Sequence, residues 1–435
     1  MKFYDREYEL KRLKSNITMS KSTSIMSVII GRRRIGKTKL ILKSVENEDF
    51  LYFFIAKKNE SLLCEEFVGE AKDKDFSIFG SITRFKDLFE LLLEASKERN
   101  FTLIIDEFQE FYSVNTAVFS EMQNLWDKYK DESKLNLILC GSVYSMMKTI
   151  FEDSKEPLFG RATEKMYLQA FNVNTLKEII ADNNSNYSSL DLLSFYIFTG
   201  GVAKYVELFV DKKILTYESM VNEIFRPNSY FLEEGKNMLI EEFGKEYSTY
   251  FSILSLIASS KTSRTEIESL LAKNIGGFLD KLENHYNLIK KVRPILAKQG
   301  SRKQKYYIRD NFLNFWFRFI YKNRSAIEIE NFDYLKSVFN RDFSTFSGRL
   351  LEQYFIQKLS LLNKYSEIGT YWEKANQNEI DIVAIDELNK EVLIAEVKMN
   401  KEKISINNLM NKSIKLVTNF KNYKIEYNGF SIEDM

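Results

Sequence analysis

Residues 25–38 join an apolar run to a glycine-rich turn, and this junction constrains the fold more than any other part of the sequence. The run Ile25 to Ile30 continues directly into GRRRIGKT, residues 31–38, and a helical stretch follows. This is the complete spacing of a phosphate-binding P-loop, in the strand-to-helix context that such a loop requires. The alternative is an ordinary strand-to-helix turn in which the Lys-Thr pair occurs by chance. The spacing and its context favour the P-loop and an α/β domain that binds ATP.

The residue types in this loop suit the phosphate chain of a nucleotide. Gly31 and Gly36 permit the tight turn that directs backbone N–H groups at phosphates, and the following helix adds the positive end of its dipole. We expect Lys37 to bridge the β and γ phosphates of ATP and to act in catalysis. We expect Thr38 to place a hydroxyl ligand on Mg²⁺.

Two further apolar runs end in polar residues, as expected of parallel strands whose carboxyl ends line a ligand site. Residues 101–105 lead to Asp106 and Glu107. We expect Asp106 to hold Mg²⁺ through water and Glu107 to polarise the attacking water, whereas the alternative is a solvated strand end. Residues 135–139 lead to Ser142, which could sense the γ-phosphate or belong to an ordinary Gly-Ser turn.

Several stretches of the chain resemble the archaeal-type P-loop ATPases of the STAND/AAA+ group, and the resemblance covers nearly the whole chain. The matching stretches are Phe3 to Glu9, Gly31 to Thr38, Ile104 to Gln109, Leu139 to Ser142, Pro157 to Arg161 and Thr199 to Gly201. The sequence departs from this family at Ala203, where a proline usually stands, and the departure concerns the turn of the lid rather than the ATP site.

The resemblance implies roles for residues that the motifs alone do not assign. It places Ser142 on a strand inserted between those carrying Lys37 and Asp106, which favours the sensor role. It also implies that Arg161 approaches the γ-phosphate as a sensor or arginine finger, and that Arg6, with its neighbour Glu7, flanks the base.

The pattern of apolar residues changes along the chain and predicts the order of its domains. Residues 1–171 alternate strand-like and helical stretches, which is typical of a parallel sheet. Residues 172–240 indicate a helical lid, residues 241–325 indicate helices and a hairpin that form a winged helix-turn-helix, and residues 326–435 return to mixed α and β. The predicted fold class is therefore α/β, a P-loop NTPase followed by two smaller domains.

The predicted hairpin is strongly basic. Residues 290–309 contain no Asp or Glu, and the expected DNA-binding wing consists of Lys290, Lys291, Arg293, Lys298, Arg302, Lys303 and Lys305. Such cations can follow a phosphate backbone. The logarithm of the binding constant then falls with the logarithm of the salt concentration, with a slope of about 0.9 per neutralised phosphate. The helix before the hairpin is slightly acidic, so base reading in the major groove is not indicated. The alternative is a winged helix used for packing or protein contacts.

The C-terminal region places charged side chains on apolar strands. A helix from Gly348 carries Glu352, and the strand-like runs that follow carry Asp381 and then Glu396 and Lys398. Glu396 and Lys398 are two residues apart on a strand and therefore project from the same face. Unpaired charge is costly in a buried strand, so a divalent cation and a substrate phosphate are the expected partners.

The same region resembles the PD-(D/E)XK nuclease superfamily, which has a restriction-endonuclease-like α/β fold, in the order of its elements and charged residues. The resemblance implies Asp381 and Glu396 as Mg²⁺ ligands and Glu352 as an accessory ligand. It implies that Lys398 stabilises developing charge or positions water, and Glu379 adds a further carboxylate. Oxygen ligands suit Mg²⁺ better than zinc. The alternative is a nuclease fold kept for structure, with an ordinary Glu-Lys pair on an edge strand.

Composition narrows the chemistry of both predicted sites. The chain of 435 residues has one His and two Cys, with 63 Lys and Arg against 61 Asp and Glu. A zinc site built from several thiolates or imidazoles is excluded, so catalysis must depend mainly on carboxylates, Lys, Arg and hydroxyls. The charged N-terminus and the short apolar stretch at residues 312–321 favour a cytoplasmic protein with no membrane partner, and an oligomer is compatible with the sequence.

These observations lead to one functional hypothesis and one alternative. The hypothesis is an ATP-hydrolysing protein coupled, through the winged helix, to Mg²⁺-dependent DNA cleavage by the C-terminal domain. The alternative is an ATP-dependent regulator or scaffold that binds DNA or protein without cleaving it. ATP hydrolysis alone does not separate the two, because both require it.

Overall fold

The computed structural model describes residues 1–298, 300–301 and 303–435, so Arg302 lies outside the described residues. The chain divides into two compact units, one of Asp5–Ala170 and one of Phe171–Met435 with Met1–Tyr4. Only the first predicted domain boundary, at residue 171, coincides with this division. The boundaries predicted at residues 240 and 325 fall inside the second unit and stay predictions.

The first unit is built on a five-stranded sheet with strand order β2-β3-β4-β1-β5. Every neighbouring pair in this sheet is parallel. The strands are β1 (Ile25–Ile30), β2 (Phe50–Phe54), β3 (Phe101–Asp106), β4 (Leu135–Gly141) and β5 (Glu164–Tyr167). The parallel sheet predicted from the sequence is confirmed. Strand β4 lies between β1 and β3, which is the insertion that the family resemblance implied.

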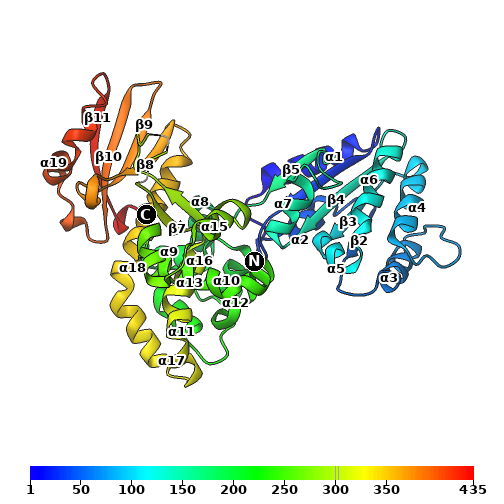
Figure 1. The fold of residues 1–435 in the computed structure, drawn as a ribbon, viewed down its shortest axis with the longest axis horizontal. Coiled ribbons are helices and arrows are strands. Elements are labelled where there is room, and N and C mark those ends of the chain that lie inside the picture. The colour runs from blue at the N-terminus through cyan, green and yellow to red at the C-terminus, as the bar shows by residue number, and fades with distance from the viewer. Residues whose placement is uncertain (299, 302) are drawn as a thin grey trace. The chain divides into compact units, whose positions relative to one another are not determined.

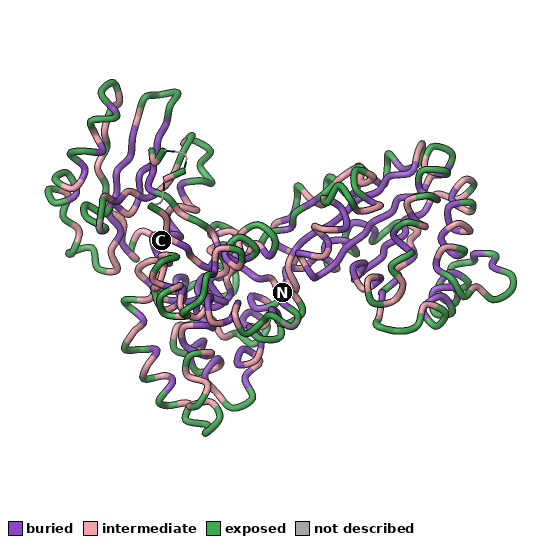
Figure 2. Tube along the Cα trace, viewed as in Figure 1, coloured by how far each residue is buried: buried purple, intermediate pink, exposed green. Residues whose placement is uncertain are grey.

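Helices cover this sheet because its three central strands are mainly apolar. Every residue of β1, β3 and β4 is buried, as the purple tube in Figure 2 shows. The helices of the unit are α1 (Glu7–Met19), α2 (Lys37–Ser44), α3 (Glu60–Lys72), α4 (Phe85–Glu98), α5 (Phe111–Val114), α6 (Ala117–Tyr129) and α7 (Tyr144–Glu152). A parallel sheet needs cover on both faces, and these amphipathic helices supply it.

The second unit begins with a helical region and a short hairpin. Its helices are α8 (Val173–Asn183), α9 (Ser189–Thr199), α10 (Ala203–Asp211), α11 (Tyr217–Ile224), α12 (Tyr230–Phe243), α13 (Tyr247–Ala258), α14 (Arg264–Leu271), α15 (Gly276–Asp280), α16 (Asn311–Phe315) and α17 (Arg324–Glu328). Strands β6 (Ile289–Val292) and β7 (Lys305–Ile308) pair antiparallel. The helix before the hairpin, α15, continues beyond Asp280 as a π-helical turn, Lys281–His285.

A glycine pair connects α9 to α10 at a point where the chain passes very close to itself. Gly201 has φ 73°, and a Cβ atom there would lie 2.2 Å from the carbonyl oxygen of Phe171. The N–H of Phe171 in turn donates to the carbonyl oxygen of Gly201 at 2.8 Å. Glycine is therefore required at position 201, while Ala203 simply begins α10 where the family usually has proline.

The second unit ends in a mixed sheet of strand order β11-β10-β9-β8 (orange and red in Figure 1). Its elements are α18 (Phe332–Ser360), β8 (Glu367–Tyr371), β9 (Ile380–Asp386), β10 (Glu391–Lys398), α19 (Ile406–Val417) and β11 (Lys424–Ser431). Strands β10 and β11 are parallel, and the other pairs are antiparallel. Helix α18 starts well before the expected Gly348, because Leu335, Phe339 and Phe343 continue its buried stripe.

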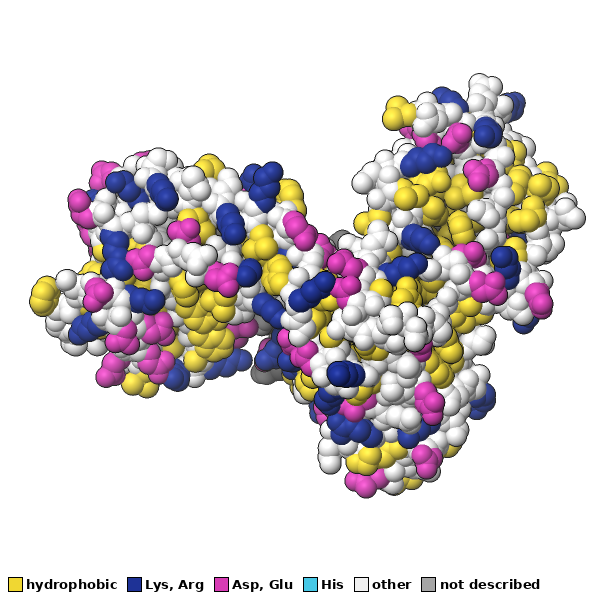
Figure 3. All heavy atoms as spheres, turned by 180° about the vertical axis from the view of Figure 1, so that it is seen from behind, with side chains coloured by type: hydrophobic (Ala, Val, Ile, Leu, Met, Phe, Trp, Pro, Cys, Tyr) yellow, Lys and Arg dark blue, Asp and Glu magenta, His cyan; other side chains and the backbone are white. Residues whose placement is uncertain are grey.

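The surface carries charges of both signs. On the face shown in Figure 3, Lys and Arg side chains are interspersed with Asp and Glu, and patches of hydrophobic atoms lie between them. In the part of the chain that the structure describes, no helix is long and apolar enough to cross a membrane.

Candidate functional site

The P-loop connects β1 to α2 at the carboxyl end of the parallel sheet. The Lys37 ammonium donates to the carbonyl oxygens of Gly31 at 2.8 Å and Arg32 at 2.9 Å, so the loop wraps around its own lysine. Lys37 is buried, and burial lowers the pKa of its ammonium, against the opposing effect of nearby groups that include Glu107 and Asp106. A buried cation at the centre of a loop is a strong attractor for an anionic ligand.

The two glycines of the loop fit a phosphate chain for separate reasons. Gly36 has φ 92°, a conformation that side-chain-bearing residues rarely adopt. A Cβ atom on Gly31 would lie 2.4 Å from Cδ1 of Ile35 and 3.0 Å from the carbonyl oxygen of Leu168. Because both positions exclude side chains, backbone N–H groups of the loop can approach a bound phosphate closely. The loop therefore fits the triphosphate of ATP.

Asp106 stands at the end of β3 and accepts hydrogen bonds from three neighbouring elements. Its Oδ2 accepts from Thr38 Oγ1 at 2.8 Å and from the Tyr52 hydroxyl at 2.7 Å, and its Oδ1 accepts from Cys140 Sγ at 3.0 Å. Thr38 and Asp106, the residues expected to hold Mg²⁺, are thus in direct contact. Tyr52 was missed in the sequence, although it lies beside β3 on β2 and pairs with Ile104, two residues before Asp106.

Glu107, the expected catalytic base, is held by two side chains in a left-handed backbone conformation with φ 55°. Its Oε2 accepts from Ser142 Oγ at 2.7 Å and from Gln109 Nε2 at 2.6 Å. The Oε1 of Gln109 is buried without a hydrogen-bond partner, and a Cβ on Gly141 would lie 2.0 Å from it. Gln109 was part of the family resemblance but received no role, and the structure makes it the residue that orients Glu107.

Arg6 lies at the same edge of the sheet as the P-loop. Its Nη2 donates to the carbonyl oxygen of Gln169 at 2.6 Å, and Gln169 follows the carboxyl end of β5. Leu168 lies between the end of β5 and Gln169. Its N–H donates to the carbonyl oxygen of Ile30, the last residue before the P-loop. Arg6 is buried, and burial lowers the pKa of its guanidinium. This position suits the expected place beside the nucleotide.

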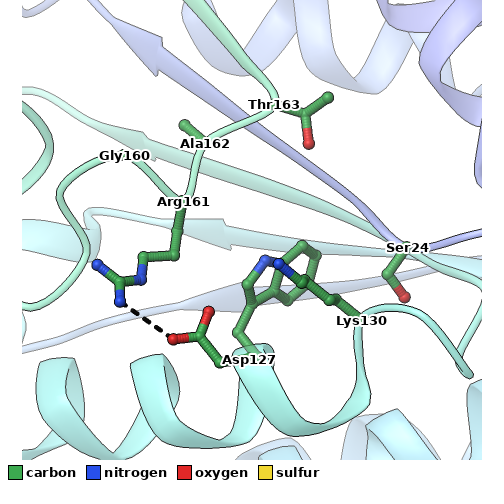
Figure 4. A pocket seen from close by; sticks show the side chains of 8 residues that line it. Ser24, Asp127, Lys130, Gly160, Arg161, Ala162 and Thr163 are labelled. Atoms are coloured by element: carbon green, nitrogen blue, oxygen red, sulfur yellow. Dashed lines mark hydrogen bonds and ion pairs between the residues drawn. The ribbon is translucent and has the colours of Figure 1, made fainter.

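Arg161, expected to approach the γ-phosphate, lies near the end of β1 opposite to the P-loop. It precedes β5, whose first residue Glu164 pairs with Ser27 near the amino end of β1, whereas the P-loop follows the carboxyl end of β1. Arg161 instead bonds to Asp127 at 3.1 Å, on the wall of a cavity of about 440 Å³ that Ser24 also lines (Figure 4). The length of β1 separates Arg161 from Lys37 within one chain, and its role as a sensor or arginine finger stays a prediction.

The basic hairpin offers fewer free cations than its sequence suggests. Lys305 pairs with Glu379 at 2.8 Å and Lys291 pairs with Glu283 at 3.0 Å. Burial, helped by the nearby guanidinium groups of Arg349 and Arg309, lowers the pKa of Lys290 to about 8. The hairpin cations that the structure shows as exposed on this segment include Arg293, Lys298 and Lys303. The DNA-binding wing stays a prediction, and among the described residues it rests mainly on these three cations.

Asp381, Glu396 and Lys398 meet on one face of the C-terminal sheet. Ala395 on β10 pairs with Ile382 on β9, so the next residues, Glu396 and Asp381, stand opposite each other. The Lys398 ammonium lies 3.4 Å from Asp381 Oδ2 and 3.4 Å from Glu396 Oε1. Burial opposes the charge on Lys398, but the two carboxylates raise its pKa above the usual value.

The carboxylates around this face are largely paired with basic side chains. Glu396 also pairs with Lys412 of α19 at 3.1 Å, and Glu352 pairs with Arg349. The pKa of Glu352 is raised to about 7. Burial is the main cause, the negative charges of Asp381 and Glu379 add to it, and Arg349 acts in the opposite direction. Within residues 1–298, 300–301 and 303–435, no three acidic, His or Cys side chains gather into a metal-binding group. Asp381 and Glu396 supply oxygen donors of the type that Mg²⁺ prefers, but Glu352 is held by Arg349.

Lys412 was missed in the sequence, although its position carries a signal. It lies three residues after Leu409 and one before Ser413, two buried residues of α19. A lysine beside the buried face of a helix that packs on β10 is placed to reach a strand carboxylate.

Two family models match the chain, one over the first compact unit and the start of the second, and one inside the second unit. Residues 3–209 match a family described as an ATPase domain predominantly from Archaea. Residues 316–413 match a family of archaeal and bacterial proteins of unknown function. The first match covers the P-loop, the β3 carboxylates and the α9–α10 connection, and the second covers Asp381, Glu396, Lys398 and Lys412.

Relatives and solved structures agree with these matches. An uncharacterised protein of Methanocaldococcus jannaschii is 31% identical over 405 residues, which are 91% of this chain and 87% of the relative. The solved Walker-type ATPase of Pyrococcus abyssi is 18% identical and has a TM-score of 0.52, over 72% of this chain and 96% of that one. At this identity the solved structure shows the shared fold alone. The chain therefore belongs to the same family as the M. jannaschii protein and is an ATPase with a domain of the predominantly archaeal type.

Proposed function

We propose that this ATPase couples ATP hydrolysis to Mg²⁺-dependent cleavage of DNA at the C-terminal face that carries Asp381, Glu396 and Lys398. The observation that carries the proposal is the convergence of these three side chains from two strands. They meet on a sheet whose element order is the one that the nuclease resemblance implied. Two carboxylates and a lysine at such short range form the minimal set for metal-assisted phosphodiester hydrolysis.

At the nucleotide site, each side chain has a task that follows from its position. Lys37 would turn from its two loop carbonyls to the β and γ phosphates, and the N–H groups around Gly36 would hold the phosphate chain. Thr38 and Asp106 would hold Mg²⁺, which neutralises phosphate charge when bound. Glu107 would accept the hydrogen bond of the attacking water, with Ser142 and Gln109 fixing the direction of its carboxylate.

At the C-terminal site, Asp381 and Glu396 would hold Mg²⁺, which supplies Lewis-acid polarisation of the phosphodiester when bound. Lys398 lies within reach of both carboxylates and would stabilise the negative charge that develops on the phosphorus-bound oxygens. Lys412 would keep Glu396 ionised, because it holds the pKa of this carboxyl below its ordinary value despite burial. Glu352 would remain paired with Arg349 rather than act as a metal ligand.

DNA is the proposed partner of the second unit. Helices α13, α14 and α15 followed by the β6–β7 hairpin are the elements of a winged helix-turn-helix, and the exposed Arg293, Lys298 and Lys303 support contact with phosphates. Contact through the backbone predicts binding that depends on salt more than on sequence.

The proposal is tested by cleavage of plasmid and linear DNA with Mg²⁺, with and without ATP. The variants are Asp381→Asn, Glu396→Gln and Lys37→Met, with Glu426→Gln on the neighbouring strand β11 as a control. We expect Asp381→Asn to lose DNA cleavage while it keeps ATP hydrolysis. We expect Lys37→Met to lose ATP hydrolysis, and its DNA cleavage should no longer depend on ATP. Equal cleavage by wild type and Asp381→Asn would refute the nuclease assignment.

A specific observation favours one alternative function. Glu396 has two lysine partners and Glu352 has an arginine partner, so the acidic face is largely neutralised within the chain. A regulator or scaffold that binds DNA or protein in an ATP-dependent manner, without cleavage, would need no more than this. Absence of cleavage with Mg²⁺ and with Mn²⁺, together with DNA binding that changes with ATP, would establish the alternative.

A further inference from the structure

The β6–β7 hairpin shares its packing with the C-terminal sheet. In the segment that follows β6, the N–H of Ile295 donates to the carbonyl oxygen of Thr370 on β8 at 2.8 Å. The Ile295 side chain is buried in the same hydrophobic cluster as Ile380, Val383 and Ile394 of the sheet. Figure 1 shows β7 next to this sheet, and both belong to one compact unit. The hairpin is therefore fastened to the C-terminal domain at one of its ends.

The two faces of β7 have different environments. Tyr306 and Ile308 are buried, and the N–H of Tyr306 donates to Thr262 in the helical region. Lys305 and Tyr307 alternate with them and project from the opposite face. Lys305 pairs with Glu379 at 2.8 Å, and the Arg349 guanidinium lies 4.4 Å from the centre of the Tyr307 ring. This second face of β7 borders the acidic residues of the C-terminal sheet.

The pair of Lys305 and Glu379 is held in place by more than its charges. The Lys305 side chain is only 14% exposed, and its ammonium lies 4.6 Å from the centre of the buried Trp372 ring. Glu379 stands two residues before Asp381, so it projects from the same face of the strand region. Arg349 connects the other side of the hairpin to the site, because it pairs with Glu352 as well as covering Tyr307.

From these contacts we infer that the hairpin is one wall of the C-terminal site and delivers a DNA backbone to it. This inference rests on the proposed function and concerns how that site takes its substrate. The exposed Arg293, Lys298 and Lys303 lie on the segment that joins β6 to β7, and Ile295 fastens this segment to β8, so it would hold phosphates beside the C-terminal sheet. Lys305 is a positioning residue that holds the hairpin against the site through Glu379.

The inference separates two effects that an independent DNA-binding wing would combine. Loss of the exposed cations should weaken binding, because the field of the hairpin attracts phosphates. Loss of the Lys305–Glu379 pair should leave binding unchanged, since neither group contacts DNA, but it should misplace the bound strand relative to Asp381. Such a misplacement is expected to reduce the rate of cleavage by about 10- to 100-fold.

The binding test uses the full chain with a short fluorescent DNA duplex and its single strand, in EDTA so that no cleavage occurs. Replacing Arg293, Lys298 and Lys303 together by Ala should weaken binding and make the salt slope on duplex shallower by about 2.7. Lys305→Met should bind within about 2-fold of wild type, well under the tenfold change that 1.4 kcal/mol produces. Lys212→Met is the matched control, since Lys212 forms a similar pair with Glu223 outside the hairpin.

The positioning test measures hydrogen exchange of residues 380–398 with and without DNA, together with cleavage in Mg²⁺. We expect DNA to slow exchange there in wild type and less so in Lys305→Met, whose kcat for cleavage falls while its KM is retained. If the wild type binds DNA and shows this protection but never cleaves, the inference stands and the nuclease assignment fails. If the wild type cleaves and Lys305→Met cleaves equally well, the inference is overturned, as it also is if wild type does not bind DNA.

Discussion

The nucleotide site and the C-terminal site both bring lysine and carboxylates together, but they use the lysine differently. Lys37 donates to two carbonyl oxygens of its own loop, whereas Lys398 lies between the carboxylates of Asp381 and Glu396. The first arrangement leaves a positive charge available to an incoming anion. The second arrangement balances its charges within the chain. The difference teaches that a lysine held by backbone carbonyl oxygens is better placed to meet an anionic ligand than a lysine bonded to carboxylates.

The largest expected effect tests the first half of this comparison. Lys37→Met should reduce ATP hydrolysis by about 10²–10³-fold, because it removes a charge that acts on the phosphates. Its unfolding free energy should not fall, since the change also removes a buried cation whose pKa burial lowers. Steady-state hydrolysis and urea unfolding measure the two quantities, with Lys43→Met on the exposed side of α2 as the control. A decrease in the unfolding free energy as large as the increase in the activation free energy of hydrolysis would contradict the comparison.

Lys290 is a second lysine whose pKa is lowered by burial, it has no proposed ligand, and its replacement has the next largest expected effect. Its folded-state pKa of about 8 lies below the ordinary 10.5, so at pH 7 the folded chain bears a cost of roughly 3 kcal/mol at most. The folded state releases this proton first as pH rises, so wild-type stability should increase between pH 8 and about 10.4.

Lys290→Met should be more stable than wild type at pH 7, and the gain should disappear toward pH 10. Thermal or urea unfolding across this range measures the effect, and Lys291→Met serves as the control because Lys291 pairs with Glu283. A gain that does not change with pH would show that packing, rather than charge burial, explains it.

The parallel sheet, and the grouping of side chains at both candidate sites, could be predicted from the sequence where local rules decide. Gly36 and Lys37 follow from a short motif, and Glu396 and Lys398 follow from the alternation of a strand. The sequence could not predict how far each side chain is buried or which side chains it contacts. Lys290 and Lys305 look like solvated cations in a basic run, and only the packing of the hairpin against the C-terminal domain makes them internal.

Arg161 and Gln109 show the same limit in opposite directions. Arg161 was assigned by resemblance, but its place at the amino end of β5 depends on strand register, which no short motif encodes. Gln109 received no role because a glutamine after two carboxylates is unremarkable in sequence. Its position becomes visible only in the structure, where its amide nitrogen donates to Glu107 and its amide oxygen packs at Gly141.

A smaller effect sharpens the account of the nucleotide site. Ser142→Ala removes the hydroxyl that donates to Glu107 at 2.7 Å, so Glu107 should lose part of its orientation. We expect kcat for ATP hydrolysis to fall by about 10-fold with little change in KM, as for a positioning residue. A rise in KM with unchanged kcat would instead show that Ser142 contributes to ATP binding.

The smallest effect tests the second half of the comparison. Glu396→Gln deprives Lys398 and Lys412 of a shared partner, so the unfolding free energy should fall by about 1 kcal/mol, since both lysines are partly exposed and screened. Chemical unfolding measures the change against Glu426→Gln on β11, where the side chain is exposed. Unchanged stability would mean that the ion pairs of Glu396 do not stabilise the fold, and the contrast with Lys37 would then fail.

Helix α18 gives the second unit a stiff connection between distant parts. Its 29 residues span about 43 Å at 1.5 Å per residue. Phe339, in its first half, packs on Phe198 and Phe225 of the helical region, and Phe355, in its second half, stacks on Phe430 of the C-terminal sheet. Arg349 and Glu352 lie between these anchors. A displacement of the helical layer that moves Phe339 is therefore delivered as a rigid shift of Arg349 and Glu352, without any flexible joint to absorb it.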